Sequence, residues 1–139
     1  MTATERDTTL RLQAWGVTIP MSLAPMALSK NTRTHWRVQR RAFAAQRDFV
    51  IRVWQCEQSP ELRENVQPWE RASLFVEWRY ALGRHPDDDN AIARVSACRD
   101  AFQAIGLVRD DAVIQTAGVT FTKVKRGEES VTVSLRRDE

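Results

Sequence analysis

Cysteine and histidine are scarce in this sequence. The 139 residues contain two cysteines, Cys56 and Cys98, and two histidines, and none of them has the close spacing of a zinc site. Two distant cysteines also exclude a disulfide-stapled scaffold and predict reduced thiols in a cytosolic setting. Any metal bound by this chain should therefore be a hard ion held by carboxylate oxygens.

Long hydrophobic runs are absent as well. No stretch approaches the roughly 20 apolar residues of a membrane-spanning helix, so we expect no membrane partner. Residues 1–7 are polar and mixed in charge, which argues against a signal peptide and predicts a frayed, disordered start. The hydrophobic content of 42% nevertheless allows a substantial core, and the length fits a single domain over residues 1–139.

The sequence has an excess of positive charge, and most of it is arginine. Of 21 basic residues 18 are Arg, whose guanidinium suits bidentate contacts with phosphate. The segment from Lys30 to Arg52 is the most basic, with seven basic residues and a single acid, Asp48. This local density favours a nucleic-acid surface more than the net charge of +3 does. The alternative is an ordinary solvated helix face.

Hydrophobic periodicity predicts four strands and two main helices. Alternation predicts strands over residues 8–19, 72–80, 112–124 and 130–135, and helical spacing predicts helices over 35–55 and 90–105. Residues 20–34 and 125–129 have the composition of a loop and a hairpin turn. The βαβαββ order predicts an α+β fold, in which two main helices cover a mixed four-stranded sheet.

Five aspartates form two short clusters on either side of the second predicted helix: Asp87, Asp88, Asp89, Asp110 and Asp111. Repulsion among these carboxylates is costly unless a cation lies between them. If the clusters converge, Asp87, Asp89 and Asp111 can hold Mg²⁺ or Mn²⁺, and the metal can activate water for phosphodiester hydrolysis. Convergence requires the strand after Asp111 to run beside the strand that ends at Tyr80, with the linkers bending inward. The alternative is that the acids cap a helix and form a solvated turn.

Four motifs occur in order along most of the chain. They are Asn31-x-Arg33-x-His35-Trp36-Arg37, Asp87-x-Asp89-Asn90, Asp100-Ala101-Phe102 and Gly106-Leu107-x-x-Asp110-Asp111. This order resembles the RusA family of phage-type Holliday-junction resolvases, which are small homodimeric Mg²⁺-dependent endonucleases that cut four-way DNA junctions symmetrically. The resemblance implies a RusA-like fold, a homodimer, and Asp87, Asp89 and Asp111 as catalytic and metal-binding residues, with Asp110 and Asn90 in support.

The basic residues are then expected to bind DNA. The expected DNA-binding residues are Arg33, His35, Arg37, Arg40, Arg41, Arg94, Arg99 and Lys123. Trp36 could stack on an unpaired base, but the simpler interpretation, which we favour, places it in the core at the start of the helix. His85 is expected to be an exposed turn residue beside the acids.

One position departs from the family pattern. Many relatives carry a lysine on the helix that follows the Asp-x-Asp-Asn motif, and Ser96 stands at the matching position. Arg99 shares the helical face of Ser96, but a guanidinium is too basic to exchange protons.

The expected function is therefore Mg²⁺-dependent resolution of Holliday junctions, in DNA recombination and repair in the cytoplasm of a bacterial or phage-infected cell. The alternatives are a branched-DNA-binding protein with weak or lost cleavage, or a related nuclease acting on other branched or single-stranded DNA.

Overall fold

The fold is described by a computed structural model over residues 12–30 and 32–138. The expected frayed start, the first part of the strand predicted at 8–19, and Asn31 of the basic motif lie outside the described residues. The elements are β1 (Ala14–Pro20), α2 (Trp36–Glu57), α3 (Pro60–Asn65), β2 (Ala72–Tyr80), α4 (Asp88–Ala93), α5 (Ser96–Ala104), β3 (Ile114–Lys123) and β4 (Ser130–Arg137). Two short 3₁₀ turns, Met21–Leu23 and Met26–Leu28, lie within the predicted loop at 20–34.

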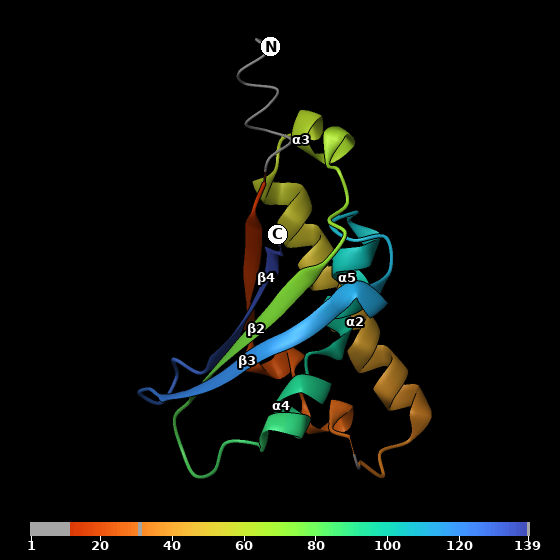
Figure 1. Cartoon of the computed structure of the whole chain (residues 1–139). Helices are drawn as coiled ribbons and strands as arrows, with labels where there is room; N and C mark the ends of the chain where they lie inside the picture. Colours follow the sequence, from red (N-terminus) through yellow and green to blue (C-terminus); the bar gives the residue numbers. More distant parts are fainter. Residues whose placement is uncertain (1–11, 31, 139) are drawn as a thin grey trace.

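The four strands form one mixed sheet in the order β1-β4-β2-β3 (Figure 1). β4 runs antiparallel to both β1 and β2, whereas β2 and β3 run parallel to each other. The predicted α+β fold with a mixed four-stranded sheet is therefore confirmed. The strand predicted over residues 72–80 has those bounds in the structure, because its alternation of apolar and half-buried residues is continuous.

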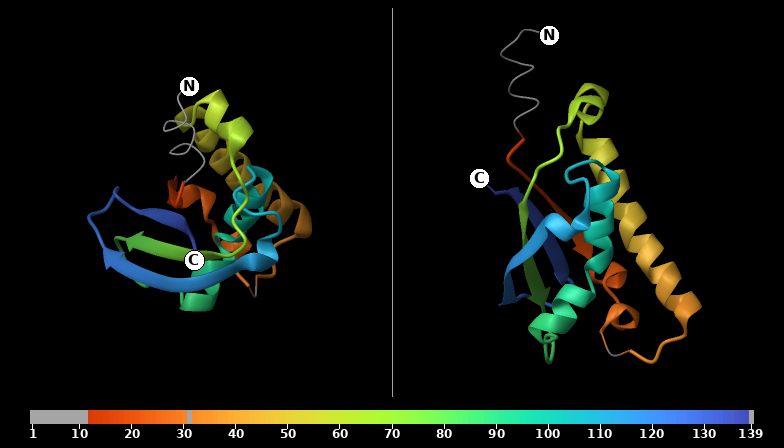
Figure 2. Two further views of the ribbon diagram at one scale, coloured as in Figure 1. Left: turned by 45° about the horizontal axis from the view of Figure 1, so that its top comes forward. Right: turned by 45° about the vertical axis from the view of Figure 1, so that its right-hand side comes forward.

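The core lies between one face of the sheet and the helices α2 and α5 (Figure 2). Alternate residues of the three strands β1, β4 and β2 point into it, as the strand period of two requires. Trp54 of α2 packs edge-on against Trp15 of β1, with ring centroids 5.1 Å apart. Trp54 and Trp78 are both buried. No helix in the described part of the chain is long and apolar enough to cross a membrane.

The second helix is interrupted where the sequence predicted one continuous helix over residues 90–105. α4 ends at Ala93 and α5 begins at Ser96, with Arg94 and Val95 between them. The interruption has a physical cause in tertiary hydrogen bonds. The side-chain amide of Gln46, fully buried on α2, donates to the carbonyl oxygens of Arg94 and Leu23, each at 2.7 Å. The prediction of a single helix was wrong because these partners are distant in sequence.

Candidate nucleic-acid interface and acidic clusters

The first acidic cluster forms the start of α4. The Asp87 carboxylate accepts a hydrogen bond from the backbone N–H of Asn90 at 2.8 Å, so Asp87 caps the helix, as the capping alternative expected. Asp88 and Asp89 follow in the first turn, where the helix dipole favours negative charge. The Asp89 side chain is 76% exposed. This cluster is thus open to a ligand in solvent.

A basic segment is tied directly to this cluster. The backbone N–H of Lys30 donates to the side-chain oxygen of Asn90 at 2.9 Å, and the Lys30 ammonium lies 4.0 Å from the Asp89 carboxylate. The motif residue Asn90 therefore links the acidic start of α4 to the loop that leads into α2. Figure 1 shows α4 and the first turn of α2 at the same end of the molecule.

The second acidic cluster follows α5. Asp110 caps a 3₁₀ turn, Asp111–Val113, by accepting from the backbone N–H of Ala112 at 2.9 Å. The Arg99 guanidinium donates to the carbonyl oxygens of Asp111 and Ile114, each at 3.0 Å. Arg99, expected to bind DNA, thus holds the backbone of Asp111 at the start of β3.

The strand pairing sets the two clusters toward opposite ends of β3. β3 does run beside β2, as convergence required, but the parallel pairing sets Ile114 against Ala72 at the start of β2. His85, two residues before Asp87, stacks on Phe121 near the other end of β3, with ring centroids 3.8 Å apart. Ile114 and Phe121 lie roughly 23 Å apart along the strand, at about 3.3 Å per residue.

The described side chains form no group of three metal ligands. Within residues 12–30 and 32–138, no three Asp, Glu, His or Cys side chains lie close enough together to hold one metal ion. The expectation that Asp87, Asp89 and Asp111 hold one metal ion stays a prediction. The direction of β3 bears on it, since a strand–helix–strand crossover returns the chain to the start of the neighbouring strand.

The residues expected to bind DNA divide into two groups. Six of them are exposed and lie at the same end as Asp87: Arg33, His35, Arg37, Arg40, Arg41 and Lys123. Lys123 reaches that end because it pairs with Tyr80, the last residue of β2. Arg94 and Arg99 are instead half-buried and donate to backbone carbonyls.

Trp36 corrects the interpretation that we favoured from the sequence. It is the first residue of α2 and is 53% exposed, so it is not part of the core. The preceding residue, His35, caps the helix through its ring nitrogen Nδ1, which accepts from the N–H of Arg37 at 3.1 Å. His85 is exposed, as expected.

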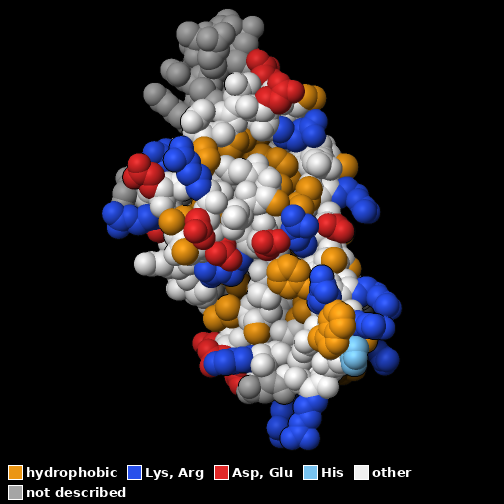
Figure 3. All heavy atoms as spheres, turned by 90° about the vertical axis from the view of Figure 1, so that its right-hand side faces the viewer, with side chains coloured by type: hydrophobic (Ala, Val, Ile, Leu, Met, Phe, Trp, Pro, Cys, Tyr) orange, Lys and Arg blue, Asp and Glu red, His pale blue; other side chains and the backbone are white. Residues whose placement is uncertain are grey.

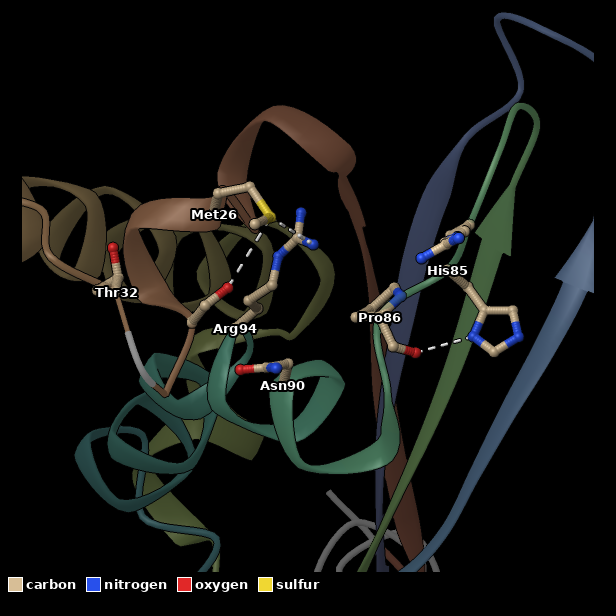
Figure 4. Close-up of a pocket in the computed structure, with 8 residues that line it drawn as sticks. Met26, Thr32, His85, Pro86, Asn90 and Arg94 are labelled. Carbon is tan, nitrogen blue, oxygen red and sulfur yellow. Dashed lines mark hydrogen bonds between the residues drawn. The ribbon is translucent and has the colours of Figure 1, made fainter.

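A cavity of about 420 Å³ opens beside the first acidic cluster (Figure 4). Its lining comes from three separate segments, and includes Ser29, Thr32, His85, Asn90 and Arg94. The Arg94 guanidinium donates to the carbonyl of Ala24 at 2.8 Å and lies 4.8 Å from the centre of the Trp78 ring. Burial lowers the pKa of Arg94 from its ordinary value. Arg94 thus gives one wall of the cavity a positive charge that is fixed in place.

Sequence reasoning missed two residues that organise this region. Gln46 was not singled out, although a polar residue between Phe43 and Val50 on the apolar face of the helix is a detectable signal. Lys30 was counted only as part of the basic segment. Arg47 differs from its basic neighbours because its guanidinium pairs with Asp100 of α5 at 2.6 Å. Ser96 is half-buried at the start of α5.

Comparison of the chain with protein families and with curated proteins found no match.

Proposed function

We propose that this protein is a structure-selective endodeoxyribonuclease that acts on four-way DNA junctions as a homodimer, with Mg²⁺ or Mn²⁺. The observation that carries the proposal is the Asp87-x-Asp89-Asn90 motif at the start of α4, where Asp87 and Asp89 are exposed and exposed basic side chains lie at the same end of the molecule. A polyanion held by those cations would bring a phosphate close to this exposed acidic group.

The carboxylates of one chain fit only part of a three-aspartate metal site. Mg²⁺ commonly takes one or two protein carboxylates and completes its shell with water and substrate phosphate. Asp89 and the second oxygen of Asp87 suit that role, and the metal would supply an activated water and stabilise the leaving oxygen. In this proposal Asp111 joins them from a second copy, because β3 starts at the opposite end of β2, and the dimer is then a requirement for a complete site. In a two-fold dimer each chain would contribute its Asp111 to the other chain's site. The two sites would then be equal, which suits paired cuts in a symmetric junction.

The remaining chain residues would bind and orient the DNA. The exposed arginines of α2 would contact the phosphate backbone, and Lys123 would extend that contact from the end of β3. The half-buried Arg94 is fixed by the Ala24 carbonyl and the Trp78 ring, so it would act as a rigid positive charge.

The decisive experiment compares Asp89→Asn with Asp88→Asn on a labelled four-way junction, with fork and flap substrates in parallel. Asp89→Asn should abolish Mg²⁺-dependent cleavage while junction binding in EDTA stays within about twofold. Asp88→Asn removes a neighbouring carboxylate of equal charge and should leave cleavage within a few-fold. Equal cleavage by both variants, or no cleavage by the unmodified protein in a Mg²⁺ and Mn²⁺ series, contradicts the proposal.

A second candidate is a branched-DNA-binding protein with weak or lost cleavage. Two observations favour it: Ser96 stands where relatives carry a lysine, and the acidic clusters are separated in the chain. Tight junction binding without product under any metal would select this candidate. Cleavage confined to forks, flaps or single strands would instead select a related nuclease with another substrate.

A further inference from the structure

The first turn of α2 exposes an aromatic side chain without an apolar partner. Trp36 is 53% exposed, whereas Trp15, Trp54, Trp69 and Trp78 are all buried. Trp36 does not belong to the hydrophobic core or to the residues packed against it. Single exposed apolar side chains are ordinary on protein surfaces, so the groups around Trp36 decide what its ring can bind.

The surroundings of Trp36 are cationic. The ring of His35 stacks beside it at 5.6 Å between centroids, with planes 27° apart. The guanidinium carbons of Arg37 and Arg40 lie 5.4 and 5.5 Å from the centre of the indole ring. Among residues 12–30 and 32–138, neither arginine forms an ion pair with a carboxylate. Figure 3 shows Lys and Arg side chains gathered around hydrophobic and His side chains at the lower end of this face.

We propose that Trp36 stacks an unpaired nucleobase, while Arg37 and Arg40 contact the flanking phosphates. Bases out of a duplex stack on aromatic rings and on guanidinium planes, and the same arginines neutralise the adjacent backbone. We favour a nucleic acid over a protein partner because the indole ring lies beside two guanidinium groups that, among the described residues, have no carboxylate partner. The inference rests on the proposed function and specifies which part of the DNA is recognised: nucleotides unpaired at the branch point.

The surface between Trp36 and the first acidic cluster could carry a single strand of DNA. Arg40, together with Ala27 and Ser29, lines a hollow beside the first turns of α2. Ser29 also lines the cavity that Asn90 borders, so the two depressions adjoin. A single strand with one base on Trp36 could therefore continue past Ser29 toward the start of α4.

The test measures binding in EDTA, so that cleavage plays no part. Fluorescence anisotropy compares three labelled probes: a 12-nucleotide oligo-dT, a blunt duplex and a four-way junction. Because stacking contributes about 1–3 kcal/mol per base, Trp36→Ala should weaken oligo-dT binding by roughly tenfold. Its effect on the blunt duplex should stay below twofold. Trp36→Phe should recover most of the loss.

Two further measurements separate stacking from charge and from folding. Val38→Ala removes another exposed apolar side chain of α2 and should change nothing. Arg40→Ala should lower the slope of log K against log salt on oligo-dT by about 0.7, whereas Trp36→Ala should leave that slope unchanged. Oligo-dT carrying 5-iodouracil should photo-cross-link to the peptide that contains Trp36.

The inference is overturned if Trp36→Ala binds oligo-dT normally, or if it loses the same factor on the duplex. A cross-link confined to other peptides also overturns it, as does a complete lack of oligo-dT binding, which would point to a protein partner at Trp36. If the protein cleaves junctions but Trp36→Ala binds oligo-dT normally, only this inference is contradicted. If binding depends on Trp36 but no junction is cleaved, only the proposed nuclease activity is contradicted.

Discussion

The buried side-chain amide of Gln46 donates a hydrogen bond of 2.7 Å to the carbonyl oxygen of Arg94, where α4 gives way to α5. The same nitrogen donates to Leu23 at 2.7 Å, and the Gln46 carbonyl lies 3.5 Å from the Cys98 sulfur. The Gln46 side chain thus links α2 to the loop at Leu23 and to the break between α4 and α5.

Gln46→Leu should destabilise the protein strongly. The substitution removes the donor from two part-buried carbonyl groups, at a cost of about 1–2.5 kcal/mol each. The free energy of unfolding, measured by urea titration, should therefore fall by about 2–5 kcal/mol. Gln55→Leu, an exposed change on the same helix, should shift it by no more than about 0.5 kcal/mol. Equal effects of the two variants would show that the Gln46 hydrogen bonds contribute little.

Arg99→Ala should loosen the start of β3. The Arg99 guanidinium donates to the backbone of Asp111 and Ile114, so its loss should cost about 1–3 kcal/mol and speed hydrogen exchange near Ile114. Arg109→Ala, an exposed change close by, serves as the control. If Arg99 acts only through DNA, its removal will leave stability unchanged and only weaken junction binding.

Mixed dimers should show whether Asp111 works across the dimer. Differently tagged Asp89→Asn and Asp111→Asn chains are co-expressed, and the mixed species is purified through both tags. If the carboxylates combine between chains, one of its two sites is intact, and the mixed dimer should nick a junction that neither parent cuts. If each site used a single chain, both sites would be damaged and the mixed dimer would be inactive.

The two thiols should differ in reactivity. Cys56 is exposed, whereas Cys98 is buried and burial raises its pKa to about 12. A thiol reagent at pH 8 should therefore modify one thiol per native chain and two after denaturation. In Cys56→Ser no native thiol should react. Rapid modification of both thiols in the native protein would mean that the core around Cys98 opens readily.

The Cys98 thiol should also make stability depend on alkaline pH. In the unfolded chain it ionises near pH 9, but in the folded chain it keeps its proton until about pH 12. Its contribution is therefore fully present below about pH 9 and is lost as the pH rises toward 12. Urea midpoints should fall over that range in the unmodified protein and in Cys56→Ser, and fall less in Cys98→Ala.

Local patterns predicted the elements better than their arrangement. The strand at residues 72–80 follows from alternation alone, and the mixed α+β sheet follows from the element order. The break at Arg94 depends on Gln46, 48 residues away, and no local period reveals it. Trp36 has the spacing of a core residue, and only the packing of the chain shows that it is 53% exposed.

The sequence predicted only part of the placement of the candidate residues. Asp87, Asp89 and the basic residues of α2 do share one end of the molecule. Asp111 does not, and the signal for this was present: a strand, a helix and a second strand in succession favour parallel pairing. Parallel pairing of β2 and β3 carries the residue before β3 back to the opposite end of the sheet.

The sheet order also sets the sequence of events in folding. β4 is the last strand along the chain, yet it lies between β1 and β2 and pairs Leu135 with both Trp15 and Leu74. Because β1 and β2 do not pair with each other, they can enter one sheet only after β4 has been synthesised. Contacts this distant in sequence slow folding and leave strand edges exposed in the meantime. A nascent chain stopped before Ser130 would lack the strand that unites the two halves of its sheet.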